Sequence, residues 1–282
     1  MQRLLIVGAV RDAAKTIQQI HMVFEKSFED FDKDYFLVES DSSDSSLKIL
    51  LEMSRTYNNF AFVSLGNLSD SVANRSSRIA TCRNEYLREF ESRDRKYDYL
   101  VIADWDNVNR YLTKNAVNSC WRSNDWEVCT ANQKGAYYDL WALRCEDWLD
   151  YDCQLDFLRN SNIDGVRRSY FKNFIRPMFH TQRFNQWTRT RSSFGGLAIY
   201  KAQVIGKYRY STRSEFVCEH VEFHEAMSRD GVRIFINPEL INSNWTSNVY
   251  RSCLEFLFYI VFGKVYNHVR NRRYYSHFLL KT

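Results

Sequence analysis

The sequence predicts an α/β fold with a mostly parallel central sheet and helices on both of its faces. Over residues 3–104, short apolar runs alternate with segments whose apolar residues recur at helical spacing. The chain of 282 residues contains only 2 Pro and 9 Gly, and 45% of its residues are hydrophobic. This composition is typical of a compact chain and argues against linkers or disorder.

The elements of the first half follow one another directly. "RLLIVGAV" at residues 3–10 is an apolar run typical of a buried strand, and the next segment carries apolar residues at helical spacing. We expect strands at residues 3–10, from residue 34 into an acidic, Ser-rich loop, at 60–66 and at 97–104, with helices at 13–28, 46–57 and 76–90. Such alternation builds βαβ units, so these four strands should be parallel.

The second half is less regular. We expect strands at residues 126–133, 137–144, 192–201 and 232–240, and a helix at 218–231 that Gly231 closes. Residues 146–190 are polar, aromatic and basic, which indicates helical stretches and a long active-site loop. A lid is expected around residues 170–193, flanked by Arg176, Arg183, Arg189 and Arg191.

The C-terminal segment differs from the rest, so we divide the chain into a domain of residues 1–250 and a helical tail of residues 251–282. "CLEFLFYIVF" at residues 253–262 is strongly apolar but too short to span a bilayer. One interpretation is a helix docked on the domain. The other is peripheral membrane contact, with the apolar face in lipid and basic residues on anionic head groups, namely Lys264, Arg270, Arg272 and Arg273.

Charge and cysteine content limit the function classes. The net charge of +5 fits a protein that handles phosphates or touches an anionic membrane, and it does not require nucleic acid as a partner. The seven Cys include no CxxC pair, which argues against structural zinc and indicates reduced thiols in the cytoplasm, either in solution or at the membrane surface. The absence of P-loop and GxGxxG patterns disfavours ordinary ATPases and Rossmann dehydrogenases.

Two carboxylates stand at the end of the fourth predicted strand, in Asp104-Trp105-Asp106. Ligands of parallel sheets bind beyond the carboxyl ends of the strands, and carboxylates there are costly unless they are paired or bound to a metal. Oxygen ligands at i and i+2 suit Mn²⁺ or Mg²⁺. The alternative is a helix cap by Asp106 or Asn107. If the metal site is real, Trp105 should point away from it, into the protein or over a ligand.

The acidic loop "ESDSSDSS" at residues 39–46 follows the second strand. Its carboxylates and hydroxyls can bond a base edge and a ribose, while the alternative is a helix cap by Asp44 or Ser45. Arg78 and Arg83 lie five residues apart in the third predicted helix, and the guanidinium fork suits a pyrophosphate. The alternative for both arginines is a solvated basic face.

This order of motifs resembles a GT-A glycosyltransferase. Such families open with a short apolar strand, place an acidic loop after the second strand and carry a DxD motif after the fourth, as "ESDSSDSS" and "DWD" do here. "CRN" at residues 82–84 is similar to another recurring segment. Over residues 3–240 the chain resembles family 2-like transferases and the fungal capsule-associated mannosyltransferase-like group. Glu39-Ser40 replaces the common Asp-Asp pair, which leaves the nucleotide open.

The resemblance implies transfer of a hexose, with mannose as one candidate, from a GDP- or UDP-sugar to a glycan or lipid-linked acceptor. It implies Mn²⁺ or Mg²⁺ on Asp104 and Asp106. Gly195-Gly196 would let the backbone approach the sugar, or else form a tight turn. The residues expected at the donor are Val10, Arg11, Glu39, Asp41, Asp44, Arg78, Arg83, Asp104, Gly195 and Gly196.

The helix "CEHVEFHEAM" completes the expected site. His220 and His224 are i and i+4, on one helical face, and Val221 replaces the Glu that a zincin would need. By the resemblance, Glu219 is the first candidate for a base or electrostatic stabiliser, Glu222 is the second, and either histidine would be a third metal ligand. The alternative is that each histidine only packs or bonds the backbone. Trp126, Tyr138 and Trp141 are candidates for stacking on a sugar, or for core packing.

Two other classes rank lower. A sugar nucleotidylyltransferase would need a Gly-rich, basic phosphate loop, and "VGAVRDAAK" at residues 7–15 has a single Gly. A non-catalytic module that binds RNA or another polyanion would draw on the surplus of Arg and Tyr.

Overall fold

An eight-stranded mixed sheet organises the chain. The computed structural model describes residues 1–94, 96–180, 186–212 and 217–261. The strands are β1 (Arg3–Val10), β2 (Asp32–Glu39), β3 (Phe60–Ser64), β4 (Tyr99–Ala103), β5 (Val128–Gln133), β6 (Thr188–Thr190), β7 (Leu197–Lys201) and β8 (Ile234–Ser243). They lie in the order β3-β2-β1-β4-β7-β5-β8-β6. The predicted α/β fold class is confirmed.

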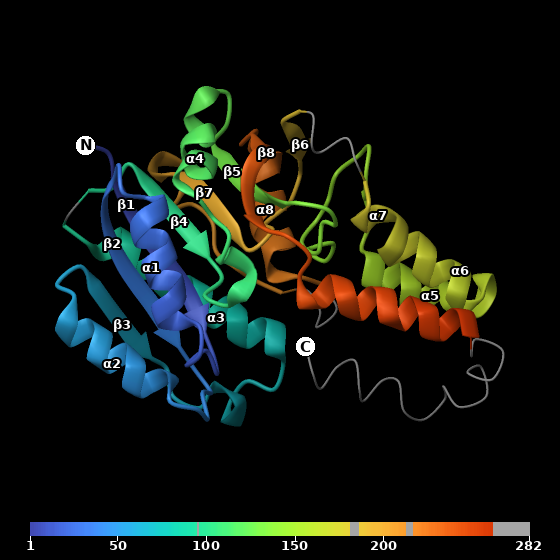
Figure 1. The fold of residues 1–282 in the computed structure, drawn as a ribbon, viewed down its shortest axis with the longest axis horizontal. Helices are drawn as coiled ribbons and strands as arrows, with labels where there is room; N and C mark the ends of the chain where they lie inside the picture. The colour runs from blue at the N-terminus through green and yellow to red at the C-terminus, as the bar shows by residue number, and fades with distance from the viewer. Residues whose placement is uncertain (95, 181–185, 213–216, 262–282) are drawn as a thin grey trace.

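Helices cover both faces of the sheet (Figure 1). The α-helices are α1 (Ile17–Ser27), α2 (Ser46–Thr56), α3 (Arg75–Ser92), α4 (Lys114–Asn118), α5 (Cys153–Asp164), α6 (Val166–Tyr170), α7 (Arg176–Met178) and α8 (Glu219–Arg229). Shorter helical turns are η1 (Leu68–Asp70), η2 (Asn107–Asn109), η3 (Ser119–Arg122), η4 (Phe171–Ile175) and η6 (Ala202–Val204). Residues 247–261 are also helical.

The first half has the predicted parallel arrangement. β1 pairs in parallel with both β2 and β4, and β2 pairs in parallel with β3. Alternate residues of β1 serve opposite layers: Leu4 and Ile6 pack with α1 and α2, whereas Leu5 and Val7 pack with α3 and α8. Because both faces are covered, the strand is apolar throughout, which is the pattern that made it recognisable in the sequence.

The second half departs from a parallel sheet. β7 lies antiparallel between β4 and β5, and β6 is antiparallel to β8 at the edge. This insertion brings the start of β7 beside the end of β4, where Leu197 pairs with Ala103. The turn that precedes β7 therefore lies next to Asp104.

The strand predicted at residues 137–144 is wrong. The segment is irregular, with a single bridge between Arg144 and Ser192. Tyr137, Leu140 and Leu143 are all buried in the core of a side lobe. Their spacing of three residues does not fit the alternation of a strand.

The side lobe consists of α5, α6, η4, α7 and the helix at 247–261, which lie together to the right of the sheet in Figure 1. The lid predicted at 170–193 begins in this lobe, where residues 170–178 are helical rather than a loop, and Arg189 lies in β6. Arg191 is within salt-bridge distance of Glu225 at 3.4 Å and also pairs with Asp150. Arg183 lies outside the described residues.

The C-terminal helix packs one face against the lobe through Val249 and Tyr259, which are buried. The basic residues 264–273 of the predicted tail lie outside the described residues. Within the ranges that the structure describes, no helix has the length and apolar character needed to cross a membrane.

Candidate active site

Asp104 directly follows β4. Its backbone N–H donates a hydrogen bond to the carbonyl of Gly196 at 2.9 Å, so the antiparallel neighbour fixes its position. Its side chain keeps 35% of its surface exposed, and Nη2 of Arg83 lies 3.8 Å from Oδ1. Burial and then the charge of Asp106 raise the pKa of Asp104 above the ordinary range of a carboxyl. The carboxyl end of β4 therefore presents a destabilised negative charge that a ligand can still reach.

Asp106 lies at the surface, and its Oδ1 accepts the N–H of Val108 at 2.9 Å. It is thus the N-cap of η2, as the alternative interpretation expected. Its other carboxylate oxygen makes no hydrogen bond to the described residues that would compete with a metal. The cap fixes the carboxylate without excluding a ligand role.

Trp105 points into the protein, as predicted from the sequence. It is 2% exposed and packs edge-to-face against Phe24, with ring centroids 5.2 Å apart. Gly8 of β1 makes room for the indole, because a Cβ at position 8 would lie 2.2 Å from Cδ1 of Trp105. The buried tryptophan therefore directs the aspartates on either side of it to the outer edge of the sheet.

Arg83 is buried beneath Asp104 and is paired within the protein. Its Nε donates to Oε1 of Glu219 at 3.0 Å, and its Nη1 donates to the hydroxyl of Tyr86 at 3.1 Å. Glu219 is the first residue of α8 and is only 3% exposed. This ion pair joins α3 to α8 below the site. Arg83, which the sequence assigned to a pyrophosphate, therefore also has a partner within the protein.

Asp139 is a site residue that sequence reasoning missed. Its Oδ2 accepts the N–H of Gly195 at 2.9 Å, and burial raises its pKa to about 6. Its charge, like those of Asp106 and Glu219, acts on Asp104. Asp139 was overlooked because its segment was interpreted as a strand, although a carboxylate within the aromatic run "AYYDLWAL" was a signal. We call Asp104, Asp106, Asp139 and Glu219 the carboxylate cluster.

Gly195 and Gly196 form a tight turn with φ of +67° and +83°. A Cβ on Gly196 would lie 2.6 Å from Val108 Cγ1 and 2.8 Å from the hydroxyl oxygen of Tyr138. The turn interpretation therefore holds, and Tyr138, one of the stacking candidates, lies directly on it. Trp126, by contrast, is 1% exposed and belongs to the core.

Three buried amides hold this turn against the end of β4. Asn109 Nδ2 donates to the carbonyls of Asp104 at 2.7 Å and Gly196 at 2.8 Å. Asn242 Nδ2 donates to the carbonyl of Gly195 and to Asn109 Oδ1, both at 2.8 Å, and Gln133 Nε2 reaches the same Gly195 carbonyl at 3.0 Å. These amides therefore fix the backbone that carries Asp104.

Hydrogen bonds join the loops after β1 and β2, where donor contacts were predicted. Asp12 Oδ1 accepts the N–H groups of Ser43 at 2.7 Å and Asp44 at 3.3 Å, and Asp44 Oδ2 accepts the N–H of Ala14 at 3.0 Å. Both loops leave the carboxyl ends of strands that pair, directly or through β1, with β4. They therefore share one edge of the sheet with Asp104.

Several predicted donor residues of this region also have structural partners. Glu39 accepts the N–H of Ser42 at 3.0 Å and the hydroxyl of Ser64. Asp41, at a positive φ of 59°, accepts the N–H of Ser69 at 2.8 Å and lies 3.6 Å from Nε of Arg78. The loops are therefore preorganised by the same polar groups that the sequence assigned to the nucleotide.

The remaining donor candidates are placed as follows. Arg78 Nη1 donates to two backbone carbonyls, those of Val72 and Ala73, at 2.7 Å each. Val10 is buried, and its carbonyl accepts the N–H of Ser40 at 3.3 Å. Arg11 is exposed at the end of β1 with its Nε 3.6 Å from Asp12. Of the two arginines, Arg11 presents its guanidinium group at the surface, whereas Arg78 is mostly buried.

The two histidines share one face of α8, with ring centroids 5.5 Å apart, but they are packed in the core. His224 Nε2 lies 2.7 Å from the hydroxyl of Tyr200, and its Nδ1 lies 3.4 Å from Oγ of Ser192. His220 stacks on Phe194 at 3.9 Å. This is the packing arrangement that the alternative described. A role for either histidine as a metal ligand stays a prediction, and neither is included in the carboxylate cluster.

Glu222, the second candidate base, lies one turn after the start of α8. It is half-buried, and its Oε2 accepts the hydroxyl of Ser211 at 3.0 Å. The charge of Glu219, by contrast, raises the pKa of both Asp104 and Asp139. Glu219 is therefore the carboxylate of α8 that belongs to the cluster.

The charge of the carboxylate cluster suits a divalent cation. The charges of three carboxylates, Asp106, Asp139 and Glu219, raise the pKa of Asp104, whereas the charge of Arg83 lowers it, so negative groups outnumber positive ones among the strongest influences on Asp104. A divalent cation would relieve that excess. Within the described ranges, no group of three or more His, Cys, Asp or Glu side chains is placed to hold a metal ion. A cation held by Asp104 and Asp106 would therefore need oxygens of the substrate or of water to complete its shell.

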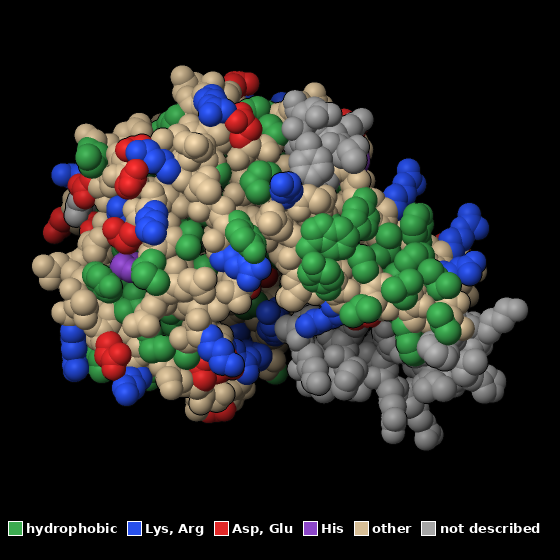
Figure 2. Space-filling view, in the orientation of Figure 1, with side chains coloured by type: hydrophobic (Ala, Val, Ile, Leu, Met, Phe, Trp, Pro, Cys, Tyr) green, Lys and Arg blue, Asp and Glu red, His purple; other side chains and the backbone are tan. Residues whose placement is uncertain are grey.

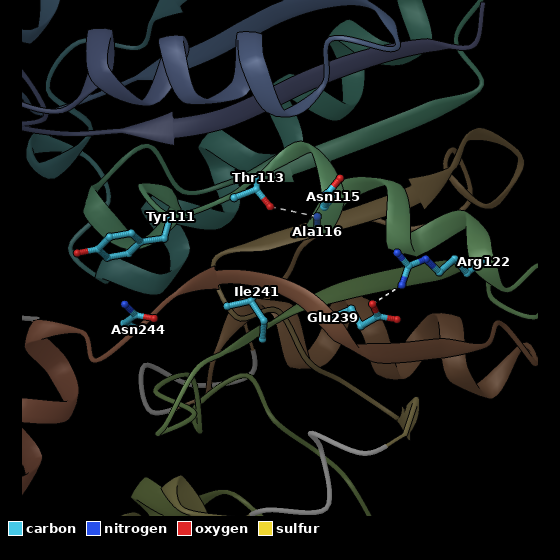
Figure 3. A pocket seen from close by; sticks show the side chains of 8 residues that line it. All are labelled: Tyr111, Thr113, Asn115, Ala116, Arg122, Glu239, Ile241 and Asn244. Atoms are coloured by element: carbon cyan, nitrogen blue, oxygen red, sulfur yellow. Dashed lines mark hydrogen bonds and ion pairs between the residues drawn. The ribbon is translucent and has the colours of Figure 1, made fainter.

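A separate pocket of about 320 Å³ lies between α4 and β8 (Figure 3). Tyr111, Ile241 and Asn244 line one end, and the ion pair of Arg122 with Glu239 lies at the other. Its lining includes no residue of the carboxylate cluster. We therefore place the chemistry at the cluster and not in this pocket.

Comparison with known proteins gives likeness in structure only. No protein-family model matches the chain, and no curated protein matches it by sequence. S. aureus TarS 1-349, solved in complex with UDP-GlcNAc, superposes with a TM-score of 0.51 at 12% identity, covering 93% of this chain and 67% of that chain. The mannosyltransferase PcManGT from Pyrobaculum calidifontis, solved with GDP-Man and Mn²⁺, gives 0.50 at 14% identity, covering 95% and 64%.

The longer S. aureus TarS structure gives a TM-score of 0.50 at 13% identity, and the match covers 93% of this chain and 40% of that one. The chain thus spans between 40% and 67% of the length of these three structures. These superpositions show a likeness of fold. The chain has the GT-A-type glycosyltransferase fold.

Proposed function

We propose that this protein is a metal-dependent glycosyltransferase that moves a hexose from a nucleotide-diphosphate sugar to a glycan or lipid-linked acceptor. The observation that carries the proposal is the placement of Asp104 and Asp106. They end the central strand of a GT-A-type sheet, at the edge where the loops after β1 and β2 also meet. In such sheets that edge binds the ligand.

The charge of the site supports a role for Mn²⁺ or Mg²⁺. A diphosphate brought to the carboxylate cluster would meet like charge, because the burial and mutual repulsion of these groups already destabilise the charged form of Asp104. Asp104 and Asp106 would hold the cation, which would neutralise the diphosphate as the glycosidic bond breaks. Trp105, fixed in the core, and the Asn109 amide keep the first carboxylate in place.

Two carboxylates of the cluster, Asp139 and Glu219, are candidates for the same role. A general base works best when its pKa lies near the operating pH, and burial raises the pKa of Asp139 to about 6. Glu219 is bonded to Arg83, so its charge is held in one orientation beside Asp104. In an inverting reaction we assign deprotonation of the acceptor hydroxyl to Asp139 or Glu219. In a retaining reaction both would stabilise a positively charged sugar.

The loops after β1 and β2 bear on the identity of the donor. The loops after β1 and β2 carry the hydroxyls and carboxylates that a base and a ribose need, and UDP- and GDP-sugars both fit that chemistry. TarS binds UDP-GlcNAc and PcManGT binds GDP-Man in the solved structures. The narrower likeness to the capsule-associated mannosyltransferase-like group rests on sequence segments alone, and mannosyl transfer stays a prediction.

A thermal-shift screen tests the proposal directly. The protein would be melted with UDP-, GDP- and CMP-sugars, each with and without Mn²⁺. The cognate donor should raise Tm in a concentration-dependent way, and more strongly with Mn²⁺, because a ligand that binds only the folded state stabilises it by mass action. If none of these donors shifts Tm with metal present, the proposed function is overturned.

A further inference from the structure

The helix at residues 247–261 has a second apolar face that the lobe does not cover. Its inner face packs through Val249 and Tyr259. On the outer face, exposed apolar residues recur at i, i+4, i+7, i+8 and i+11. They are Tyr250, Leu254, Leu257, Phe258 and Val261, and each keeps between 44% and 69% of its surface in solvent. Exposed apolar residues at this spacing form a continuous stripe, and such a stripe marks an interaction surface.

Aromatic side chains extend the stripe toward the sheet. Trp245 stacks near Tyr250 with ring centroids 5.5 Å apart, and Phe179 of the loop after α7 lies 5.7 Å from Trp245. Both are exposed by about two fifths. Figure 2 shows hydrophobic side chains gathered over the lobe, with Lys and Arg at several of the edges that are visible. We call the seven residues Phe179, Trp245, Tyr250, Leu254, Leu257, Phe258 and Val261 the apolar face.

Most of the charged residues in the helices that carry and adjoin the apolar face are basic. Residues 153–178 and 247–261 carry six Arg or Lys and three Asp or Glu, and all six basic residues are exposed. They are Arg159, Arg167, Arg168, Lys172, Arg176 and Arg251. The sequence of residues 262–282 adds five Lys or Arg and no acidic residue. A second copy of this surface would bring like charges together, so self-association is disfavoured.

We propose that the apolar face docks on a membrane whose surface carries anionic phospholipids. The helix would lie in the plane of the interface, with its leucines and Phe258 at the acyl chains and the basic residues on the head groups. Trp245 and Tyr250 are of the kind that favours the boundary between head groups and acyl chains. The helix does not meet the length and hydropathy of a spanning segment. Docking is independent of the transferase activity, because none of these residues belongs to the carboxylate cluster.

Vesicle co-sedimentation of the full chain tests this inference. Vesicles of phosphatidylcholine alone would be compared with vesicles that also contain phosphatidylserine. We expect binding to the mixed vesicles, at least about tenfold weaker binding to pure phosphatidylcholine, and release as salt is raised toward about 0.5 M, because the charge contribution is screened. Equal binding to both compositions, or no binding to either, would overturn the proposal.

A matched pair of variants identifies the surface. Leu254→Glu with Leu257→Glu places two charges on the apolar face, and partition into mixed vesicles should fall by about tenfold or more. Leu47→Glu with Leu51→Glu changes two exposed leucines of α2, at 46% and 42% exposure, and should leave partition unchanged. Similar loss in both variants would overturn the assignment.

The oligomeric state shows whether a second copy of the chain, and not a membrane, covers the apolar face. In sedimentation velocity without lipid, the wild-type chain should be a monomer. A dimer that the Leu254→Glu, Leu257→Glu variant converts to a monomer would show that the face is a self-interface, and would overturn membrane docking. If that variant failed to fold, the dependence of wild-type binding on lipid composition and salt would still decide the question.

Discussion

Arg83 Nε donates to Oε1 of Glu219 across 3.0 Å, and the pair joins α3 and α8 directly below Asp104. Both side chains are nearly inaccessible to water, at 8% and 4% exposure. Such a pair is weak evidence for added stability, because two charges had to lose their hydration. Its more specific effect here is to hold one carboxylate of the cluster in a fixed orientation and to offset part of the cluster's negative charge.

Removing one partner of this pair should be costly. Arg83→Met leaves Glu219 buried and unpaired, and we expect a loss of about 3–5 kcal/mol in the free energy of unfolding. Glu219→Gln keeps the shape and leaves Arg83 with a neutral acceptor. Urea unfolding of both single variants and the double variant gives the coupling energy. Additive losses, with no coupling, would contradict a direct ion pair.

The amide of Asn242 should matter more for activity than for stability. Asn242→Ala removes the hydrogen bonds to Gly195 and Asn109, so the backbone of Asp104 loses part of its support. We expect a loss of about 1–3 kcal/mol of stability and a fall in kcat of about tenfold or more.

Asn237 offers the matched control for Asn242. It is also a fully buried amide of β8, but it donates to Ser119 Oγ at 2.9 Å, away from the glycine turn. Asn237→Ala should destabilise the protein comparably while leaving kcat near the wild-type value. If both variants lose activity in proportion to their loss of Tm, the positioning role of Asn242 is wrong.

Gly8 should tolerate no side chain while Trp105 is present. The Cβ of Gly8→Ala would lie 2.2 Å from Cδ1 and 2.5 Å from Nε1 of the indole, and 2.6 Å from the carbonyl oxygen of Ala103, so the ring and the backbone of β4 must both move, and removal of the indole relieves only part of the clash. Overpacking of this kind costs about 1–3 kcal/mol. Thermal unfolding of Gly8→Ala, Trp105→Phe and the double variant checks the contact: the double variant should lose less stability than the sum of the single variants, and strict additivity would argue against it.

Because the pKa of Asp139 is raised, its contribution to the free energy of unfolding should fall as the pH rises. The unfolded carboxyl titrates near pH 4, whereas burial raises the folded pKa to about 6. Between these values the folded state binds the proton more tightly, so the contribution of Asp139 favours folding at low pH and is lost as the pH rises through about 6.

Asp139→Asn should remove that contribution. The difference in Tm between the variant and the wild type should therefore shift in favour of the variant as the pH rises from 4 to 7. Melting curves across this range, recorded without metal, check the sign. A difference that stays constant with pH would show that Asp139 titrates at its ordinary value.

The βαβ units and the DxD position were predictable because each depends on local sequence. β4 is apolar throughout, as β1 is after Arg3, and Asp104 and Asp106 follow directly at the end of β4. For Trp105 the sequence predicted a direction away from the metal, into the protein or over a ligand, and the structure shows the first of these. These features need no knowledge of contacts distant in sequence.

The rest of the site depends on contacts between distant segments. Nothing local in the sequence indicates that β7 inserts antiparallel beside β4, and that insertion is what places Gly195, and with it Asp139, at the site. Arg83 was correctly placed in a helix, but its partner Glu219 lies 136 residues away. His220 and His224 were correctly placed on one face of α8, but which way that face turns is set by the packing of Phe194 and Tyr200.

The most direct test of the central claim is the rate of Mn²⁺-dependent release of nucleoside diphosphate from the donor that the thermal-shift screen selects. Asp104→Asn keeps the size and polarity of the side chain and removes its charge. We expect the rate to fall by at least about 100-fold, while the metal-free variant melts no lower than the wild type because a destabilised buried charge is gone. A folded Asp104→Asn protein that releases nucleoside diphosphate at the wild-type rate, with the same Mn²⁺ dependence, would contradict the account.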